Sequence, residues 1–202
     1  MRIIGLLLLS CSLCMSCVQT DKKKALIDDD FLVAEQHLSN QLKAVPEPTV
    51  YPRTIGKDGK LIATPKNDWT EGFYPGCLWY IYEHNREENW KQSAIKWTEA
   101  LEPMKKLTSH HDIGFLIYCS FGNAYRLTGK EEYKDVIIEA ANSLTTRFSE
   151  VTGCIKSWNY RKAWNGRDEW FYPVIIDNMM NLELLYFASK VTGDTRYAKI
   201  AT

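Results

Sequence analysis

Three residues of this chain occupy equivalent positions in a repeat and have side chains that could react with a sugar or bind one. Trp69, Asp112 and Asp177 each stand at the start of an apolar stretch with helical spacing. A carboxyl group can serve as an acid or a base, and an indole ring offers a flat apolar face. A Trp and two carboxyls at one rim would suit a site that processes sugars.

Repeated helical hairpins must position these three residues. In each repeat the apolar helix ends at a polar or Gly-containing turn, and a second helix carries an aromatic residue 20 or 21 positions after the first residue. These aromatic residues are Trp90, Tyr133 and Tyr197. Such hairpins cannot bury their apolar faces alone, so they must stack around a shared core. The repeat predicts an all-α fold with equivalent positions at the same rim.

The pattern of apolar residues, prolines and glycines predicts where the elements lie. We expect helices over 28–45, 73–83, 87–106, 113–127, 131–147, 174–191 and from 195 onward. The segment 46–70 is expected to be a long loop or a small hairpin, and 149–173 is a long loop rich in Trp and basic residues. Helical spacing also predicts a set of core residues, and the core should include two cysteines: Tyr118, Phe121, Tyr125, Met179, Met180, Leu184, Leu185, Cys77 and Cys119.

Composition limits the possible functions. The 202 residues are 45% hydrophobic and 12% aromatic, which is enough for one sizeable core. Lys+Arg and Asp+Glu balance at 25 each, so no nucleic-acid partner is expected. The three cysteines after residue 17 are an odd number without metal-ligand spacing, which argues against a disulfide framework.

The first 17 residues have the pattern of an export signal, with one Arg followed by a short apolar run. They resemble a bacterial lipoprotein signal in which Cys17 is lipidated, with Cys11 as the weaker candidate. Residues 18–27 would then form a polar tether. The expected location is the periplasm or the outer membrane of a bacterium, with membrane contact only through the lipid anchor. An ordinary cleaved signal peptide is the alternative.

Three motifs carry a resemblance to a known family. DWTEGFYPGCLWYIYE, HHDIGFLIY and IIDNMMNLELL, in this order and spacing, resemble glycoside hydrolase family 88, the unsaturated glucuronyl hydrolases. The resemblance covers 28–202 and implies the N-terminal part of an (α/α)6 toroid. Because the chain ends inside a helical pattern, we expect an incomplete toroid, truncated at about half, that is of doubtful activity alone. No metal or organic cofactor is implied.

The resemblance implies a partner and a reaction. The partner is an unsaturated oligosaccharide of the glycosaminoglycan type, and the reaction removes the uronic acid that a polysaccharide lyase leaves at the non-reducing end. Asp177 would be the acid and base, assisted by Asp112, with His111 beside it as a substrate ligand. Trp69 and Trp164 would form the aromatic walls of the sugar subsite. Two further residues of the same loop, Trp158 and Trp170, lie close to Trp164 in sequence.

The family reaction adds water across the C4=C5 enol ether of the unsaturated ring. Asp177 would protonate C4 and steer water to C5, and the hemiketal would then open. An acid that works near neutral pH needs burial or a nearby like charge to raise its pKa, and Asp112 would supply that charge. The prediction therefore requires that the two carboxyl groups share one pocket.

Other interpretations remain open. Asp112 and Asp177 would also serve as helix N-caps, and Trp69 and Trp164 could be core residues. His110, His111 and Asp112 suggest a metal site, but adjacent helical residues point in different directions and no further set is spaced to complete it. A related reading is an unsaturated rhamnogalacturonyl hydrolase that acts on pectin fragments. A different class is a glycan-binding helical-repeat lipoprotein without turnover.

Overall fold

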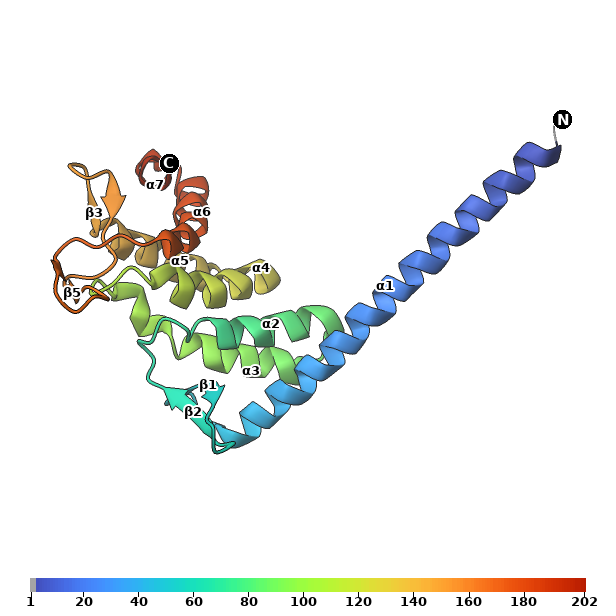
Figure 1. The fold of residues 1–202 in the computed structure, drawn as a ribbon, viewed down its shortest axis with the longest axis horizontal. Coiled ribbons are helices and arrows are strands. Elements are labelled where there is room, and N and C mark those ends of the chain that lie inside the picture. Colours follow the sequence, from blue (N-terminus) through green and yellow to red (C-terminus); the bar gives the residue numbers. More distant parts are fainter. Residues whose placement is uncertain (1–2) are drawn as a thin grey trace. The chain divides into compact units, whose positions relative to one another are not determined.

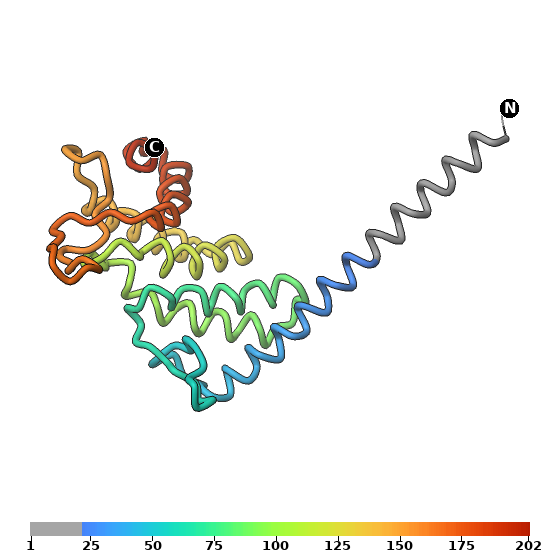
Figure 2. The backbone as a smooth tube through the Cα atoms, viewed as in Figure 1, coloured from blue at the N-terminus to red at the C-terminus, as the bar shows by residue number. Residues whose placement is uncertain are grey.

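The structure, a computed structural model, describes the backbone from residue 3 and the side chains from residue 22 (Figure 2). It divides into two units, Met1–Lys43 and Ala44–Thr202. The first unit consists of helix α1 (Ile3–Ala44), which includes the described part of the expected tether. The side chains of the predicted signal peptide, Cys17 included, lie outside the described residues. No described helix has the length and apolarity needed to cross a membrane.

The second unit is mainly helical, as Figure 1 shows. Its helices form three successive pairs, each joined by a short turn. The first pair is α2 (Phe73–Asn85) with α3 (Glu88–Glu99). The second is the π-helix η2 (Gly114–Gly122), continued by α4 (Asn123–Thr128), with α5 (Glu131–Thr145). The third is the 3-10 helix η3 (Ile176–Asn181), continued by α6 (Leu182–Thr192), with α7 (Thr195–Ala201).

The remaining elements are short. A hairpin of β1 (Tyr51–Ile55) and β2 (Leu61–Thr64) precedes α2, which confirms the small hairpin expected there. A 3-10 helix, η1 (Glu102–Lys106), follows α3. The loop 148–173, here called the tryptophan loop, contains the two-residue strands β3 (Phe148–Ser149), β4 (Cys154–Ile155), β5 (Arg161–Lys162) and β6 (Glu169–Trp170). It lies at the end of the unit where η2 and η3 begin (Figures 1 and 2).

The repeated aromatic residues hold the second helix of each pair against the core. Trp90, Tyr133 and Tyr197 are all buried, on α3, α5 and α7 respectively. Tyr133 packs edge-on against Phe121 of η2, with ring centroids 5.6 Å apart. The predicted pairing of hairpins is therefore confirmed, since equivalent positions in all three repeats serve the same packing purpose.

A glycine sets the distance between the first two helix pairs. Gly72, just before α2, lies so close to η2 that a Cβ atom there would overlap the carbonyl oxygen of Phe115. Any larger residue would push the start of α2 away from η2. Trp69, three residues earlier, is thereby kept beside the first turn of η2, where its ring lies edge-on to Phe115 at 5.7 Å.

Several predicted helices differ in detail from the structure. The helix expected from residue 28 is part of α1, which also includes the expected tether, and the helix expected from residue 174 begins at Ile176 as η3. The helix expected over 87–106 ends at Glu99 and resumes as η1, where Pro103 lies at the first turn and needs no backbone donor. The segment after Asp112 is a π-helix before it becomes α4. Side chains satisfy carbonyl groups there, with Ser120 Oγ donating to Leu116 O at 2.6 Å and Asn123 Nδ2 to Cys119 O at 2.8 Å.

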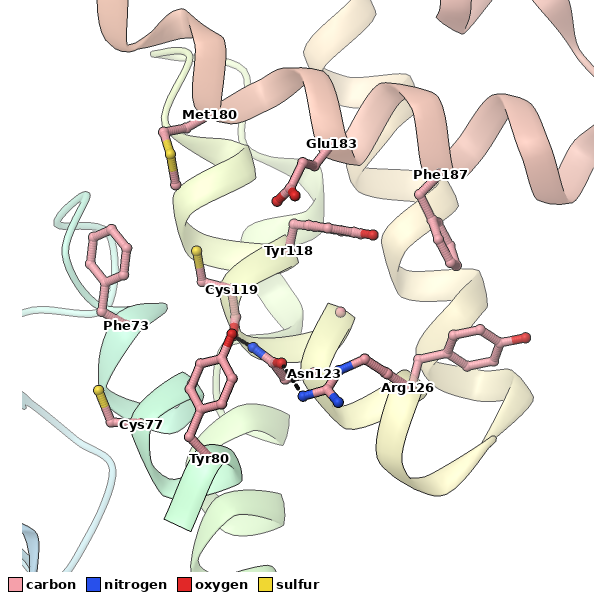
Figure 3. Close-up of a pocket in the computed structure, with 13 residues that line it drawn as sticks. Phe73, Cys77, Tyr80, Tyr118, Cys119, Asn123, Arg126, Met180, Glu183 and Phe187 are labelled. Carbon is pink, nitrogen blue, oxygen red and sulfur yellow. Dashed lines mark hydrogen bonds between the residues drawn. The ribbon is translucent and has the colours of Figure 1, made fainter. Parts of the chain in front are cut away.

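Part of the predicted core is exposed. Phe121, Leu184 and Leu185 are buried as expected, but Met179 is 60% exposed and Cys77 is also exposed. Cys77, with the half-buried Cys119 and Tyr118, lines a pocket of about 630 Å³ along the flanks of α2, η2 and α6 (Figure 3). Helical spacing identified the apolar face of these helices. It could not show that the flank lining this pocket is left uncovered by the described residues. Six residues that were predicted to be in the core are half-buried or exposed instead: Tyr118, Tyr125, Met179, Met180, Cys77 and Cys119.

Candidate active site

The tryptophan loop positions the two residues that precede η2. The backbone N–H of His111 donates to Ser157 O at 3.0 Å, and His110 forms an isolated antiparallel bridge with Trp158. The ring of Trp158 lies edge-on to the ring of His111, with centroids 5.6 Å apart. The chain is therefore fixed on both sides at the point where Asp112 begins the helix.

The same loop also positions Asp177. The N–H of Ser157 donates to Pro173 O at 2.8 Å, and its Oγ accepts from the N–H of Ile175 at 3.2 Å. Asp177 follows within the first turn of η3. Ser157 thus joins the segments that carry the two carboxyl groups, although these lie 65 positions apart in the sequence.

The structure brings His111, Asp112 and Asp177 together, and we call these three residues the carboxyl cluster. The Nε2 atom of His111 lies 3.3 Å from Asp112 Oδ1 and 3.7 Å from Asp177 Oδ1. One ligand-type atom from each residue lies within 4.8 Å of the other two. The close approach of Asp112 and Asp177 that the sequence required is therefore present.

The environment of Asp177 suits an acid. Burial raises the pKa of its carboxyl group and the charge of Asp112 adds to this rise, while His111 acts in the opposite direction. The side chain is 41% exposed, yet its Oδ1 atom is buried. One oxygen thus faces the cluster, while the side chain as a whole is partly open to solvent and the backbone N–H groups of Asp177 and Asn178 bond to the carboxyl.

His111 has the most enclosed position of the three. Its side chain is fully buried, and Nδ1 lies 2.7 Å from Oδ1 of Asn178. Asn178 donates from Nδ2 to the carbonyl of Ile155 and accepts from Asn181. His111 is therefore part of the carboxyl cluster, and the sugar contact expected for it stays a prediction.

A glycine also allows η3 to approach η2. The N–H of Gly114 donates to Asn181 Oδ1 at 2.9 Å, and a Cβ atom at Gly114 would lie only 2.5 Å from that oxygen. A side chain at this position would force η2 and η3 apart. Gly114 therefore allows the close approach of the two segments that carry Asp112 and Asp177.

Arg147 fixes the start of the tryptophan loop from inside the protein. Its buried guanidinium donates to the carbonyls of Lys156, at 2.7 Å, and Thr108. Burial lowers its pKa, whereas the charges of Tyr172 and Asp112 act in the opposite direction. The positive charge of Arg147 therefore contributes to the electrostatics of Asp112.

The two predicted aromatic walls lie in different surroundings. Trp69 is 43% exposed and packs edge-on against Phe73 and Phe115, with Arg53 over its ring at 5.5 Å. Trp164 is 75% exposed, so neither residue is a core residue. Phe115 connects Trp69 to the first turn of η2, close in sequence to Asp112.

Trp164 is connected to the carboxyl cluster through two other residues. The guanidinium of Arg161 lies between the rings of Trp158, at 4.4 Å, and Trp164, at 4.2 Å. Trp158 in turn contacts His111. The Trp that packs against the cluster is therefore Trp158, and Trp164 lies one layer farther out. Trp170 lies edge-on to Trp164 at 6.5 Å.

The carboxyl cluster also has the composition of a metal-ligand set. One imidazole and two carboxyls converge within 4.8 Å, a combination that divalent cations accept. The sequence argument against a metal was incomplete on this point, because folding brings Asp177 to a pair that sequence spacing left unfinished.

Sequence reasoning missed Asn178, Asn181 and Ser157. All three make hydrogen bonds that join the segments of the carboxyl cluster. The two Asn residues stand one and four positions after Asp177, inside a motif that the family resemblance already contained. Their spacing of three places them on one face of a helical turn, which was the available signal. Nothing in the sequence pattern pointed to Ser157.

Comparison with known proteins relates this geometry to a family. No protein-family model matches the chain. An unsaturated glucuronyl hydrolase of Formosa agariphila is 43% identical over 153 residues, which are 75% of this chain and 37% of the relative. An unsaturated chondroitin disaccharide hydrolase of Streptococcus agalactiae is 36% identical, covering 66% of this chain and 33% of the relative. The resemblance to glycoside hydrolase family 88 is confirmed.

Solved structures agree with this assignment. A crystal structure of an unsaturated glucuronyl hydrolase specific for heparin matches with a TM-score of 0.77 and 37% identity, over 86% of this chain and 44% of that one. A structure of a Streptococcus agalactiae enzyme variant in complex with dGlcA-GalNAc6S matches with a TM-score of 0.67 and 26% identity. The predicted all-α, partial (α/α)6 toroid is confirmed. The chain spans well under half the length of these relatives.

Proposed function

We propose that the whole protein is an unsaturated glucuronyl hydrolase. It would remove the 4,5-unsaturated uronic acid from the non-reducing end of oligosaccharides that a lyase has produced. The observation that carries this proposal is the position of Asp177, a carboxyl with a raised pKa beside Asp112 and His111 in the motif that matches the family. The names of the relatives support a glycosaminoglycan-type substrate, and the chondroitin and heparin disaccharides are the first to test.

Asp177 can supply the two proton transfers that hydration requires. Its carboxyl group, which is partly open to solvent, would donate a proton to C4 of the enol ether. The O–H bond breaks and a C–H bond forms. The resulting carboxylate would accept a proton from the water that adds to C5. The hemiketal then opens and releases the sugar partner. Burial raises the pKa of Asp177, and the like charge of Asp112 adds to that rise, which favours the protonated form that the reaction needs.

The aromatic residues at the surface would hold the sugar. Trp69 and Trp164 both expose ring area, and a flat unsaturated ring stacks well on such surfaces. Arg161, held between two indoles, has donors suited to an anionic group of the substrate. The roles of these residues are proposals that rest on their positions relative to the carboxyl cluster.

The decisive experiment follows the ultraviolet absorbance of the conjugated enol ether. Wild-type protein, expressed with its complete natural reading frame, is mixed with lyase-generated chondroitin and heparin disaccharides. Loss of absorbance is expected with wild type and not with Asp177→Asn. Unchanged absorbance together with saturable binding would instead favour a glycan-binding protein, and turnover restricted to pectin-derived fragments would favour a rhamnogalacturonyl hydrolase.

We also propose that the protein is exported and anchored through Cys17. The support is the sequence of the first 17 residues alone. Metabolic labelling with a fatty acid tests this location, because Cys17→Ser should lose the label. A Cys17→Ser protein that still incorporates the fatty acid would reject Cys17 as the lipidated residue.

A further inference from the structure

The hydrogen-bond chain beside His111 begins and ends at backbone groups. Asn178 Nδ2 donates to Ile155 O at 2.8 Å, and Gly114 N donates to Asn181 Oδ1 at 2.9 Å. A backbone carbonyl can only accept and a backbone N–H can only donate, so each side-chain amide has a single possible orientation. Asn181 Nδ2 then donates to Asn178 Oδ1 at 3.0 Å, which makes this oxygen an acceptor.

This chain decides which nitrogen of His111 carries a proton. Nδ1 lies 2.7 Å from Asn178 Oδ1, and an acceptor at this distance requires a proton on Nδ1. In the neutral form of the ring this is the only proton, so in that form Nε2 is bare. The bare nitrogen faces the two carboxyl groups.

Three proton acceptors then meet in a buried space. If both carboxyls were ionised, Nε2 and the two carboxylate oxygens would present only lone pairs to one another. Nε2 of His111 and Oδ1 of Asp177 are buried and make no hydrogen bond with any described residue. Buried polar atoms without partners are costly, and a proton held within the cluster would relieve that cost.

We propose that Asn178 is a positioning residue that fixes His111 as the Nδ1–H tautomer, so that the carboxyl cluster holds one proton for Asp177 to deliver. This inference rests on the proposed function. In the reaction the proton leaves Asp177 for C4, and the water that adds to C5 returns one proton to the cluster. The proton count is therefore unchanged after each turnover, and no other reagent is required.

Other charged groups near the cluster act mainly on Asp112. His110 Nδ1 lies 2.8 Å from Asp112 Oδ2, and the positive charge of Arg147 also acts on Asp112. The side chain of Asn178 is uncharged and contacts His111 through its Oδ1 atom. The backbone N–H of Asn178 bonds to the carboxyl of Asp177, and a change of the side chain leaves that donor in place. A change at Asn178 therefore tests the histidine without altering the charge of either Asp.

The first test reads the tautomer directly. Protein labelled with 15N at histidine gives two-bond 1H–15N correlations that distinguish a protonated ring nitrogen from a bare one. The chain has four histidines, and loss of one pattern in His111→Gln assigns the signal. A protonated Nδ1 with a bare Nε2 is expected below the pH at which activity is lost. A bare Nδ1 with a protonated Nε2 would overturn the proposal.

The second test removes the acceptor. In Asn178→Leu, Nδ1 has no fixed partner, so Nε2 can carry the proton and donate it to the Asp177 carboxylate. Hydrogen bonding to the charged form lowers a pKa, so the alkaline limb of the pH–rate profile should move to lower pH. We expect kcat to fall about tenfold or more with little change in KM, as for other residues that orient a catalytic group.

Asn178→Asp separates positioning from packing. It keeps an acceptor for Nδ1 but adds a negative charge that stabilises the imidazolium, so both ring nitrogens should be protonated over a wider pH range. Asn142 provides matched controls, because its Oδ1 also accepts from two side chains, Tyr197 at 2.8 Å and Arg196 at 3.1 Å. Asn142→Leu and Asn142→Asp should leave the tautomer and the pH profile of kcat unchanged.

Two results would overturn the inference. One is an Asn178→Leu protein with an unchanged tautomer and pH profile. The other is turnover that disappears after dialysis against a chelator and returns with Zn²⁺ or Mg²⁺, since a metal would then fill the space assigned to the proton. A wild-type protein that leaves every disaccharide intact would defeat the proposed function, whereas the spectra would still decide the tautomer.

Discussion

The carboxyl cluster and the tryptophan loop lie next to each other, but they are built in opposite ways. In the cluster, His111 is fully buried and its hydrogen bonds run to backbone groups through two Asn residues. In the loop, Trp164 is 75% exposed and contacts the ring of Trp170 and the guanidinium of Arg161. An acid held beside a fully buried histidine, next to an exposed aromatic surface, would suit chemistry at one fixed atom on sugars that carry different substituents.

The largest effect is expected at Asp177. Asp177→Asn keeps the size and the helix position of the side chain but removes the acid. We expect kcat to fall about 10³-fold, within the usual contribution of a general acid. The measurement is the initial rate of enol absorbance loss on an unsaturated disaccharide. Undiminished turnover in this variant would remove the catalytic role from the cluster and leave only a capping role for Asp177.

Asp112 should have the next largest effect, through charge. Asp112→Asn removes the like charge that helps raise the pKa of Asp177, so that pKa should fall. Because the acid form is present only below this pKa, activity should be lost at a lower pH than in wild type. We expect kcat at neutral pH to fall about 10²-fold. A pH–rate profile with the same alkaline limb would show that Asp112 does not act on the proton of Asp177.

Trp164 should affect binding more than chemistry. Trp164→Ala removes an exposed stacking surface worth about 1 kcal/mol, so KM should rise roughly fivefold while kcat changes little. Trp164→Phe keeps an aromatic face and should recover most of the loss. If Trp164→Ala instead lowered kcat as strongly as Asp112→Asn, the division of roles between the loop and the cluster would be wrong.

The smallest effect concerns stability at a buried carboxyl outside both regions. Burial raises the pKa of Glu71 from 4.5 to about 8, and Asp68 adds to the rise. The unfolded chain ionises this group from about pH 4.5 upward while the folded state keeps it neutral up to about 8. Stability should therefore fall as pH rises through this window. Thermal unfolding of Glu71→Gln should show a weaker fall over the same range, and parallel curves would contradict this account.

Sequence reasoning predicted what depends on periodic packing. The apolar spacing and the aromatic residues Trp90, Tyr133 and Tyr197 predicted the helix pairs, because each repeat buries the same positions. The family motifs then selected Asp112 and Asp177, whose proximity the structure bears out. In this part of the chain, local pattern and tertiary packing agree.

What sequence reasoning missed depends on contacts between distant segments. Spacing gave no sign that η2 is a π-helix or that the chain after Glu99 forms the separate 3-10 helix η1. It placed Met179 in the core, although neighbouring elements leave it exposed. Spacing also gave no sign of the hydrogen-bond partner of His111, Asn178, which lies more than sixty positions later in the sequence. Such partners are set by tertiary structure and leave no periodic signal.

Two glycines, Gly72 and Gly114, determine how closely the segments that carry Trp69, Asp112 and Asp177 can approach one another. A hydrogen atom in place of a side chain at Gly72 lets the segment with Trp69 rest on the backbone of η2, and the same is true of Gly114 and η3. An alanine at either position would act as a spacer between an aromatic face and an acid, or between the two acids. The separation between these segments is therefore set by two residues that have no side chain of their own.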